Sequence, residues 1–264
     1  MKPVIAGQAE AVADSAQRTP AVRLALASLS LSMLLSSLGI SIANVGLPTL
    51  VQAFDASFQE VQWVVIAYLL AITTLIVSVG RFGDLIGRRR LLLAGIFLFT
   101  LASALCGFAP TLWLLIGARA LQGLGAAIMM ALTLAFVGET VAKAKTGSAI
   151  GLLGTMSAIG TALGPSLGGV LIARFGWQAI FLVSVPLGAL TLLLAQRYLP
   201  VDRQAQKTGR AGFDPLGTLL LALTLAAYAL AMTTGRGLGM ALLLAALVGA
   251  GLFIWVEARV ASPL

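Results

Sequence analysis

An arginine deep inside a long apolar segment is the side chain in this sequence best placed to do chemistry. Arg119 lies in an apolar run from residue 112 to 137, and Gln122 follows one helical turn later. A charge this far from either end of a membrane span costs several kilocalories per mole unless it faces a polar cavity or a partner. Snorkelling to the outer surface is disfavoured, since Arg119 lies about 10 Å below the start of the run. We therefore expect a polar surrounding for it inside the membrane.

Few other side chains in the apolar runs can ionise. The sequence has no histidine and a single cysteine, Cys106, which we expect to be a packed thiol. Ser41, Ser78 and Ser166 are interpreted as helix-packing hydroxyls, because no base lies at a matched depth. We therefore predict no metal site, no cofactor and no enzymatic activity. The acids lie in the N-terminal tail or at the ends of apolar runs: Glu10, Asp14, Asp55, Glu60, Asp84, Glu139, Asp202, Asp214 and Glu257.

Composition indicates the elements that must position Arg119. Apolar residues make up 59% of the chain and charged residues only 10%, which excludes a water-soluble domain. A membrane-spanning helix needs roughly 20 apolar residues, so the chain has room for about eight spans. We predict an all-α polytopic membrane protein with spans at residues 22–48, 61–80, 91–109, 112–137, 149–172, 179–198, 215–234 and 240–256.

The distribution of basic residues predicts the orientation of these spans. With the N-terminus inside, fourteen of the 17 Lys and Arg residues fall in cytoplasmic segments, and only Arg174 and Arg236 fall outside. This bias predicts a multi-pass protein of the cytoplasmic membrane with both termini cytoplasmic. The net charge of +8 therefore reflects the basic residues that set the orientation of the spans, and no nucleic-acid partner is expected. We predict a cytoplasmic tail at 1–21, a six-helix bundle at 22–198, a cytoplasmic linker at 199–214 and a further helix pair at 215–264.

A short segment between the second and third spans combines glycine, acid and base. It runs from Gly80 to Leu91 and is predicted to be a loop, in which glycines permit a tight reversal and arginines anchor at anionic head groups. Asp84 is placed to bind the positive N-terminal end of a neighbouring helix. A basic loop that only sets topology is the alternative. The informative positions are Gly80, Asp84, Gly87, Arg88 and Arg89.

This segment resembles the signature loop of the major facilitator superfamily, Gly-x-Leu-x-Asp-Arg-x-Gly-Arg-Arg-x-Leu. Phe82 and Leu85 depart from that string. The resemblance implies a six-helix major facilitator bundle with a conformational gating role for the loop. Likewise, Arg119, Gln122, Gly123 and Gly125 are similar to the Arg-x-x-Gln-Gly-x-Gly string of proton-coupled members. By that resemblance, Arg119 takes part in proton coupling and Gln122 lines the substrate cavity.

The fifth span carries a glycine stripe interrupted by a proline. Gly160, Gly164 and Gly168 lie on one helical face, where small residues allow two helices to approach closely. Pro165 removes a backbone donor and is expected to bend the span. Simple helix packing explains the stripe by itself. The full string, which ends with Gly169, resembles the antiporter motif of exporters in the superfamily and implies outward transport.

The end of the first span is similar to the Leu-Asp-x-Thr-Ile-x-Asn-Val-Ala-Leu-Pro string of the fourteen-helix drug:proton antiporters. Asn44 matches the asparagine, which implies a polar contact in the substrate cavity or with a neighbouring helix. Gly39 stands where that group has an aspartate. The carboxylate expected to pair with Arg119 and to carry protons is therefore missing, since a buried carboxyl group is the usual membrane proton carrier.

The resemblance covers the first eight helices of the fourteen-helix plan, which leaves three functional hypotheses. We expect an export half-transporter for drugs or other small lipophilic compounds, coupled to protons and paired with itself or with a separately encoded second bundle. A non-functional truncated antiporter is the second hypothesis, favoured by Gly39. A regulatory membrane subunit without transport is the third. Alternating access needs two bundles around a central site, so the expected partners also include a second bundle and the lipid bilayer.

Overall fold

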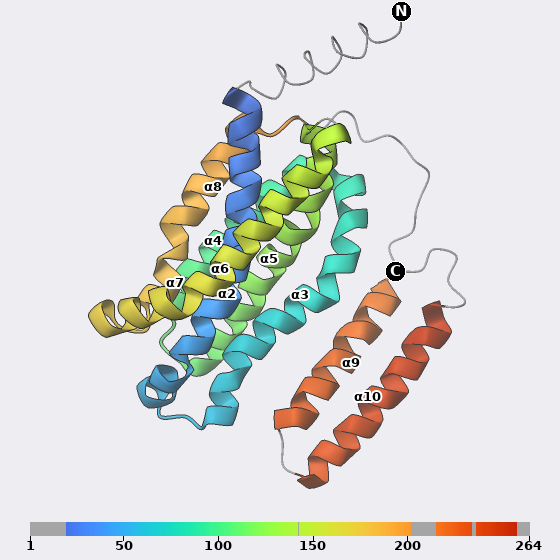
Figure 1. Cartoon of the computed structure of the whole chain (residues 1–264). Helices are drawn as coiled ribbons and strands as arrows, with labels where there is room; N and C mark the ends of the chain where they lie inside the picture. The colour runs from blue at the N-terminus through green and yellow to red at the C-terminus, as the bar shows by residue number, and fades with distance from the viewer. Residues whose placement is uncertain (1–19, 142, 202–214, 234–235, 258–264) are drawn as a thin grey trace, which may run out of the picture.

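The computed structural model describes residues 20–141, 143–201, 215–233 and 236–257 and most of their side chains (Figure 1). Within these ranges the regular structure is helical. The helices are α2 (Pro20–Phe54), α3 (Phe58–Ile86), α4 (Arg88–Gly107), α5 (Leu112–Thr140), η1 (Lys143–Lys145), α6 (Thr146–Phe175), α7 (Ala179–Leu182), α8 (Ser184–Tyr198), α9 (Pro215–Thr233) and α10 (Arg236–Glu257).

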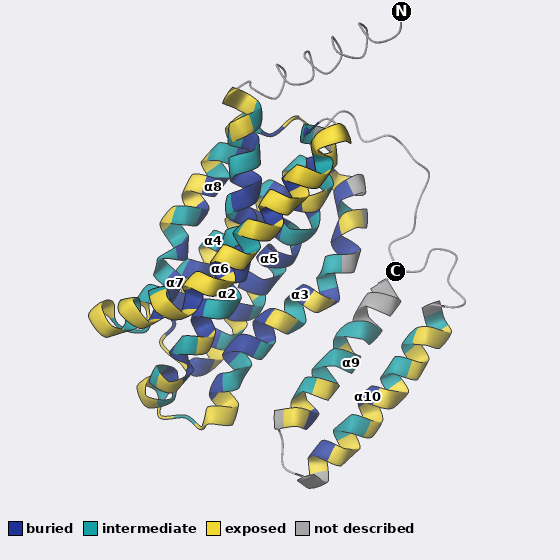
Figure 2. Cartoon of the chain, in the orientation of Figure 1, coloured by how far each residue is buried: buried dark blue, intermediate teal, exposed yellow. Residues whose placement is uncertain are grey.

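Helix α2 passes through the middle of the bundle. It contacts α6 and α8 most extensively, while α5 packs against both α3 and α4. Figure 2 shows the consequence, since buried residues follow α2 and α5 while α6 is mostly exposed. The core divides into two apolar clusters: one includes Leu29, Tyr68 and Phe136, and the other includes Leu50 and Phe181.

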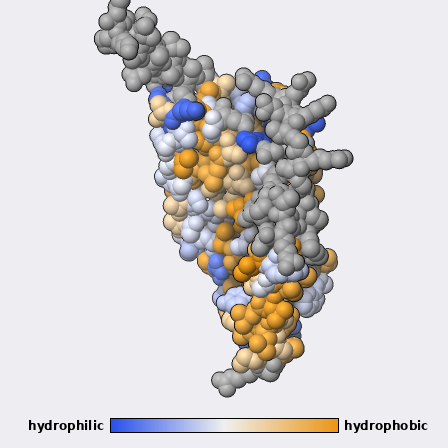
Figure 3. Space-filling model, turned by 90° about the vertical axis from the view of Figure 1, so that its right-hand side faces the viewer, coloured by the Kyte–Doolittle hydropathy of each residue, from blue (hydrophilic) through white to orange (hydrophobic). Residues whose placement is uncertain are grey.

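The described helices have the length and apolarity of membrane spans. Seven of them can cross a bilayer by these criteria, and α9 adds a shorter described apolar stretch, Leu220–Met232, where the sequence predicted an eighth span. Large exposed apolar side chains are spread over the helix surfaces, and Figure 3 shows them as broad hydrophobic areas. Exposure on this scale is expected of a surface that faces lipid. The protein is a multi-pass membrane protein.

Two helix starts are fixed by local side-chain bonds. The Ser57 hydroxyl accepts from the Glu60 backbone N–H at 3.3 Å, and the Glu60 carboxylate accepts from the Ser57 N–H at 2.8 Å. This reciprocal capping box begins α3. The Thr111 hydroxyl accepts from the Leu114 N–H at 3.4 Å and begins α5 in a similar way. These starts set the depth at which α3 and α5 present their side chains.

The predicted loop between the second and third spans is wrong in extent. Helix α3 continues through Gly80 to Ile86, and α4 begins at Arg88, so Gly87 alone separates the two helices. Gly87 has φ of 106°, which glycine adopts far more readily than other residues. A glycine within a helix costs only about 1 kcal/mol, so α3 continues through Gly80. The chain then reverses at Gly87 alone.

Helices α9 and α10 form a pair beside α3 (Figure 1). They pack on each other, and α9 contacts α3. The predicted division between bundle and helix pair stays a prediction, because residues 202–214 of the expected linker lie outside the described ranges, as does most of the predicted tail.

Candidate charge site around Arg119

Two glycines that follow Arg119 on α5 allow the neighbouring helices to contact this helix closely. A Cβ atom on Gly123 would lie 2.5 Å from the Tyr68 carbonyl oxygen of α3, and one on Gly125 would lie 2.6 Å from the Phe99 backbone nitrogen of α4. Both distances are shorter than any real side chain tolerates, so the glycines are required for this packing. Helices α3 and α4 therefore approach Arg119 from two sides.

The Arg119 guanidinium is held by a short chain of hydrogen bonds. Its Nε donates to the Val64 carbonyl oxygen of α3 at 2.9 Å, and its Nη1 donates to Gln122 Oε1. Gln122 Nε2 then donates to Ser103 Oγ of α4 at 2.7 Å. Ser103 Oγ in turn donates to the Phe99 carbonyl oxygen at 2.7 Å. The chain connects α3, α5 and α4 through side chains that are buried.

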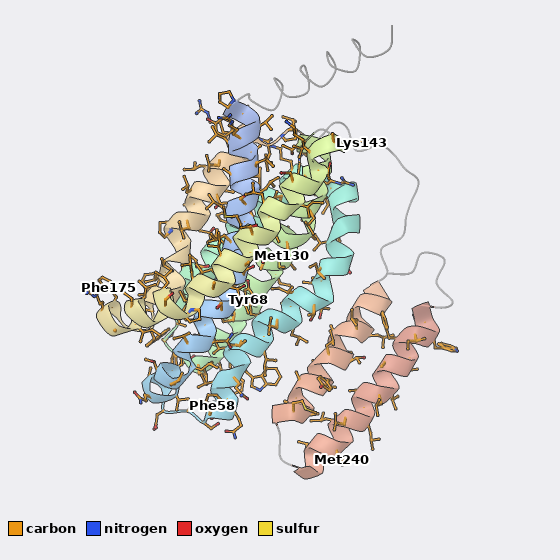
Figure 4. The ribbon with its side chains drawn as sticks, viewed as in Figure 1. Phe58, Tyr68, Met130, Lys143, Phe175 and Met240 are labelled. Atoms are coloured by element: carbon orange, nitrogen blue, oxygen red, sulfur yellow. The ribbon has the colours of Figure 1, made fainter. Side chains whose placement is uncertain are left out.

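Two aromatic rings face the same guanidinium. The Arg119 Cζ lies 4.1 Å from the centroid of the Tyr68 ring and 5.7 Å from that of Phe181. Such contacts stabilise a cation by about 2 kcal/mol where water is excluded. The Tyr68 hydroxyl donates to the Ser36 carbonyl oxygen of α2 at 2.9 Å, which fixes the ring. Figure 4 shows Tyr68 on α3, well away from Phe58 at one end of the bundle and Lys143 at the other.

The charge of Arg119 has no counter-ion among the described side chains. The residue is 0% exposed, its neighbours are neutral, and its Nη2 has no hydrogen-bond partner in the part of the chain that the structure describes. A guanidinium stays protonated at any physiological pH, so it cannot relieve this state by losing a proton. The site is a fixed buried positive charge with one unused donor.

Gly39 lies against the ring that Arg119 contacts. A Cβ atom added to Gly39 would lie 3.3 Å from the Tyr68 hydroxyl oxygen and 3.6 Å from Phe99 Cζ. A side chain at residue 39 would therefore project toward the Arg119 network. This placement is consistent with the expectation that an acid at this position would be at the depth of the arginine.

Only some of the predicted site residues meet at Arg119. Gln122 belongs to the hydrogen-bond chain, is 1% exposed and uses both ends of its amide. Asn44 is exposed on α2, and its Nδ2 donates to the Ile40 carbonyl oxygen of the same helix at 3.1 Å. Their roles in lining a substrate cavity stay predictions.

The gating residues lie at the predicted cytoplasmic end of α3 and α4. Arg89 Nη2 donates to the Gln196 carbonyl oxygen, so it binds the last turn of α8, where a positive charge is favourable. A Cβ atom on Gly80 would meet nothing within 4 Å. Arg88 and Gly87 form the start of α4, and the Asp84 side chain lies outside the described residues. The gating role of these residues stays a prediction.

The predicted antiporter string forms part of a tight contact between α6 and α2. A Cβ atom on Gly160 would lie 2.5 Å from the Leu34 carbonyl oxygen, and one on Gly164 would lie 2.9 Å from the Ile42 backbone nitrogen. Gly168 is also buried on this face, whereas a Cβ on Gly169 would meet nothing within 4 Å. Two hydroxyls join the contact: Ser37 hydrogen-bonds Ser157 at 2.6 Å, and Ser41 donates to the Thr161 carbonyl oxygen at 2.6 Å. Pro165 lies inside the continuous α6.

Sequence reasoning missed several residues of the Arg119 site. Tyr68 and Ser103 each lie in an apolar run with no neighbouring motif. Phe181 lies at the start of the sixth predicted span, where the sequence points to no contact with Arg119. Tyr68 gave one usable signal, because a buried tyrosine hydroxyl needs a hydrogen-bond partner. Trp177 is half-buried and packs against Phe54 at 5.2 Å and Phe181 at 6.3 Å between ring centroids, so it supports the ring that faces Arg119.

Known proteins resemble this chain along most of its length. It is 38% identical over 248 residues to the multidrug resistance protein Stp of Mycobacterium tuberculosis, covering 91% of this chain and 46% of Stp. It is 35% identical to the multidrug efflux pump LfrA of Mycolicibacterium smegmatis, with coverage of 95% and 50%. The riboflavin transporter RibZ of Clostridioides difficile is 36% identical, with coverage of 73% and 42%. The chain thus spans about half the length of these curated relatives or less.

Solved structures share the fold at low sequence identity. The POT family transporter PepTSo matches with a TM-score of 0.63 and 13% identity, covering 88% of this chain and 53% of that chain. A bacterial homologue of the human lysosomal transporter Spinster matches with a TM-score of 0.56 and 17% identity, covering 88% and 60%. The model of the Major Facilitator Superfamily matches residues 29–261. With this match over most of its residues, the chain belongs to the major facilitator superfamily.

Proposed function

We propose that this chain forms one bundle of a transporter that exports drugs or other small lipophilic compounds across the cytoplasmic membrane, with both chain termini in the cytoplasm. The observation that carries the proposal is the buried Arg119 network, which connects three helices inside the bundle and costs free energy that packing by itself would not require. Two of the relatives described above are named as a multidrug resistance protein and a multidrug efflux pump. The proposal extends that activity to this chain.

The central site of the proposed transporter needs a second bundle. In alternating access, two bundles move against each other around a site that both of them line. The second bundle belongs to further sequence of the same polypeptide, to a separately encoded chain or to a second copy of this one. The exposed Asn44 lies on α2 and is proposed to contact substrate on that shared surface, and Gln122 is proposed to reach it when the bundles move. The turn at Gly87, with Asp84 and Arg89 on either side, is proposed to act as the gate.

Coupling to protons is part of the proposal. Arg119 cannot exchange a proton near neutral pH, so it acts as a fixed charge. The group that balances this charge is proposed to arrive with the substrate, as a free anion or on the second bundle. The close contact of Gly160, Gly164 and Gly168 with α2 is proposed to support outward transport, as the antiporter string predicts.

Everted membrane vesicles test the proposed function. Uptake of a fluorescent lipophilic cation is followed with and without an imposed pH gradient, first with this chain as the only added transporter and then with a second six-helix bundle co-expressed. Uptake that depends on the gradient in either arm supports the proposal. Absence of uptake in both arms, with the chain shown by immunoblot to be inserted, contradicts it.

Restoring an acid at residue 39 should strengthen coupling. The Gly39→Asp side chain would project toward Tyr68 and place a titratable group beside the Arg119 site. We expect gradient-dependent uptake to rise several-fold relative to gradient-independent uptake, because a buried carboxyl group binds and releases protons where arginine does not. Gly39→Asn is the matched control, since it has the same shape without the charge. Equal gradient dependence in both variants would count against the predicted role of this position.

A further inference from the structure

Tyr68 of α3 joins helix α2 to the charge on α5. The centre of its ring lies 4.1 Å from the Arg119 Cζ atom, and its hydroxyl donates to the Ser36 carbonyl oxygen of α2 at 2.9 Å. The side chain is fully buried, so both contacts are made where water is excluded. One side chain therefore contacts a cation on one helix and the backbone of another.

The backbones of α3 and α5 place this ring over the guanidinium. Arg119 Nε donates to the Val64 carbonyl oxygen, which lies one turn before Tyr68 on the same face of α3. Gly123 follows Arg119 by one turn, and a Cβ atom on it would lie 2.5 Å from the Tyr68 carbonyl oxygen and 3.0 Å from the Tyr68 Cα atom. Glycine at this position thus lets the backbone of Tyr68 lie against α5.

The sequence of α2 leaves an acceptor open for the tyrosine hydroxyl. The Ser36 hydroxyl donates to the Ser32 carbonyl oxygen, four residues earlier, at 2.9 Å. Four residues after Ser36 comes Ile40, which has no hydroxyl, so the second acceptor position of the Ser36 carbonyl is available to Tyr68. A Cβ atom on Gly39 would lie only 3.3 Å from the Tyr68 hydroxyl oxygen, so glycine leaves room for this bond.

The ring supplies an attraction that an acidic partner would otherwise supply. Arg119 has no counter-ion among the described side chains, and the face of an aromatic ring attracts a cation within about 6 Å of its centroid. The Phe181 ring lies near that limit at 5.7 Å, whereas the Tyr68 ring lies at 4.1 Å. Tyr68 therefore makes the stronger of the two aromatic contacts, and its hydroxyl fixes the ring in a way that phenylalanine cannot.

We propose that Tyr68 is a positioning residue for Arg119 and acts in place of an acidic partner. The hydroxyl fixes the ring on α2, and the ring holds the guanidinium against the Val64 carbonyl oxygen. Because the same side chain binds both, a movement of α2 changes how firmly the charge is held. The consequence of this link for transport rests on the function proposed above, whereas the hold on the charge does not.

Thermal unfolding of the purified full chain in detergent tests the hold on the charge. The shift of the unfolding midpoint caused by Arg119→Gln is measured in the wild-type, Tyr68→Phe and Tyr68→Leu backgrounds. In Tyr68→Leu the guanidinium has already lost the ring, so Arg119→Gln should raise the midpoint by roughly 5 °C relative to its effect in the wild type. Tyr68→Phe should give a smaller difference of the same sign, because the ring remains but its hydrogen bond is lost. It also provides the test if Tyr68→Leu does not fold.

Two matched controls make this result specific. Phe181→Leu removes a buried ring that lies farther from the guanidinium, so it should alter the Arg119→Gln shift less than Tyr68→Leu does. Tyr228→Phe removes a hydroxyl from an exposed tyrosine of α9 and should leave that shift unchanged. An equal Arg119→Gln shift in all backgrounds would overturn the proposal, because a ring that only fills space gives additive effects.

Uptake in vesicles tests the link between the charge and α2. Tyr68→Phe removes only the hydroxyl that bonds to the Ser36 carbonyl oxygen. We expect the maximal gradient-driven rate to fall several-fold while the half-saturating concentration of the lipophilic cation stays unchanged, because substrate contacts are retained. A wild-type maximal rate in Tyr68→Phe would contradict the link. Absence of uptake by the wild-type chain would instead contradict the proposed function, and the unfolding shifts would still decide whether Tyr68 positions Arg119.

Discussion

Replacing Arg119 by glutamine should lower gradient-driven uptake in vesicles by at least about 100-fold while leaving the chain in the membrane. A buried charge that interacts with its surroundings by about 3–5 kcal/mol corresponds to more than two factors of ten, at about 1.4 kcal/mol each. The variant keeps a polar side chain at the position. The loss of uptake is therefore caused mainly by the missing charge and only to a small extent by the smaller side-chain volume.

The structure explains why folding should survive this change. The bonds to Val64 and Gln122 and the contact with Tyr68 are lost, which costs a few kilocalories per mole. Removal of an unpaired buried cation offsets much of that cost, because its desolvation penalty disappears. We therefore expect the midpoint of thermal unfolding to shift by only about 5 °C or less in either direction.

Matched variants separate charge from geometry. Arg119→Lys keeps the charge without the planar fork and should recover only a small part of the uptake, because lysine cannot bind Val64 and Gln122 in the same way. Arg174→Gln changes an exposed arginine in the last turn of α6 and should leave uptake unchanged. Wild-type uptake in a correctly inserted Arg119→Gln chain would remove Arg119 from the coupling mechanism.

Alanine at Gly160 should destabilise the bundle by about 2–3 kcal/mol, which is the cost of overpacking a tight contact. The added Cβ atom would lie 2.5 Å from the Leu34 carbonyl oxygen, and a backbone atom cannot move aside as the end of a flexible side chain can. Gly164→Ala should behave in the same way against Ser41 and Ile42. Unfolding of the purified chain in increasing denaturing detergent measures the effect.

Gly169 provides the control on the same helix. It belongs to the same predicted string but would place a Cβ atom in open space. Gly169→Ala should therefore be neutral or stabilising by up to about 1 kcal/mol, since alanine favours a helix over glycine. Equal stability of the Gly160 and Gly169 variants would show that close packing of α6 on α2 is not the reason for the glycine stripe.

The sequence predicted correctly that the protein is an all-helical membrane protein of the major facilitator superfamily. It failed at the turn around Gly87, because glycine inside a helix was interpreted as a breaker. In α3, a Cβ atom on Gly83 would lie 2.9 Å from Leu132 Cδ2 of α5. The glycine thus serves packing between helices, and tertiary contacts outweigh its low helix propensity.

What the sequence by itself determined is one-dimensional: apolar length, the depth of Arg119 along its span and the absence of an acid at a similar depth. These follow from the fixed rise of a helix, which converts residue number into distance. Only the tertiary structure decided which groups surround Arg119. Val64, Tyr68 and Ser103 come from other helices, and their meeting depends on how side chains of one helix fit between those of the next. That fit is set by many weak contacts along each pair of helices, so no single stretch of sequence contains it.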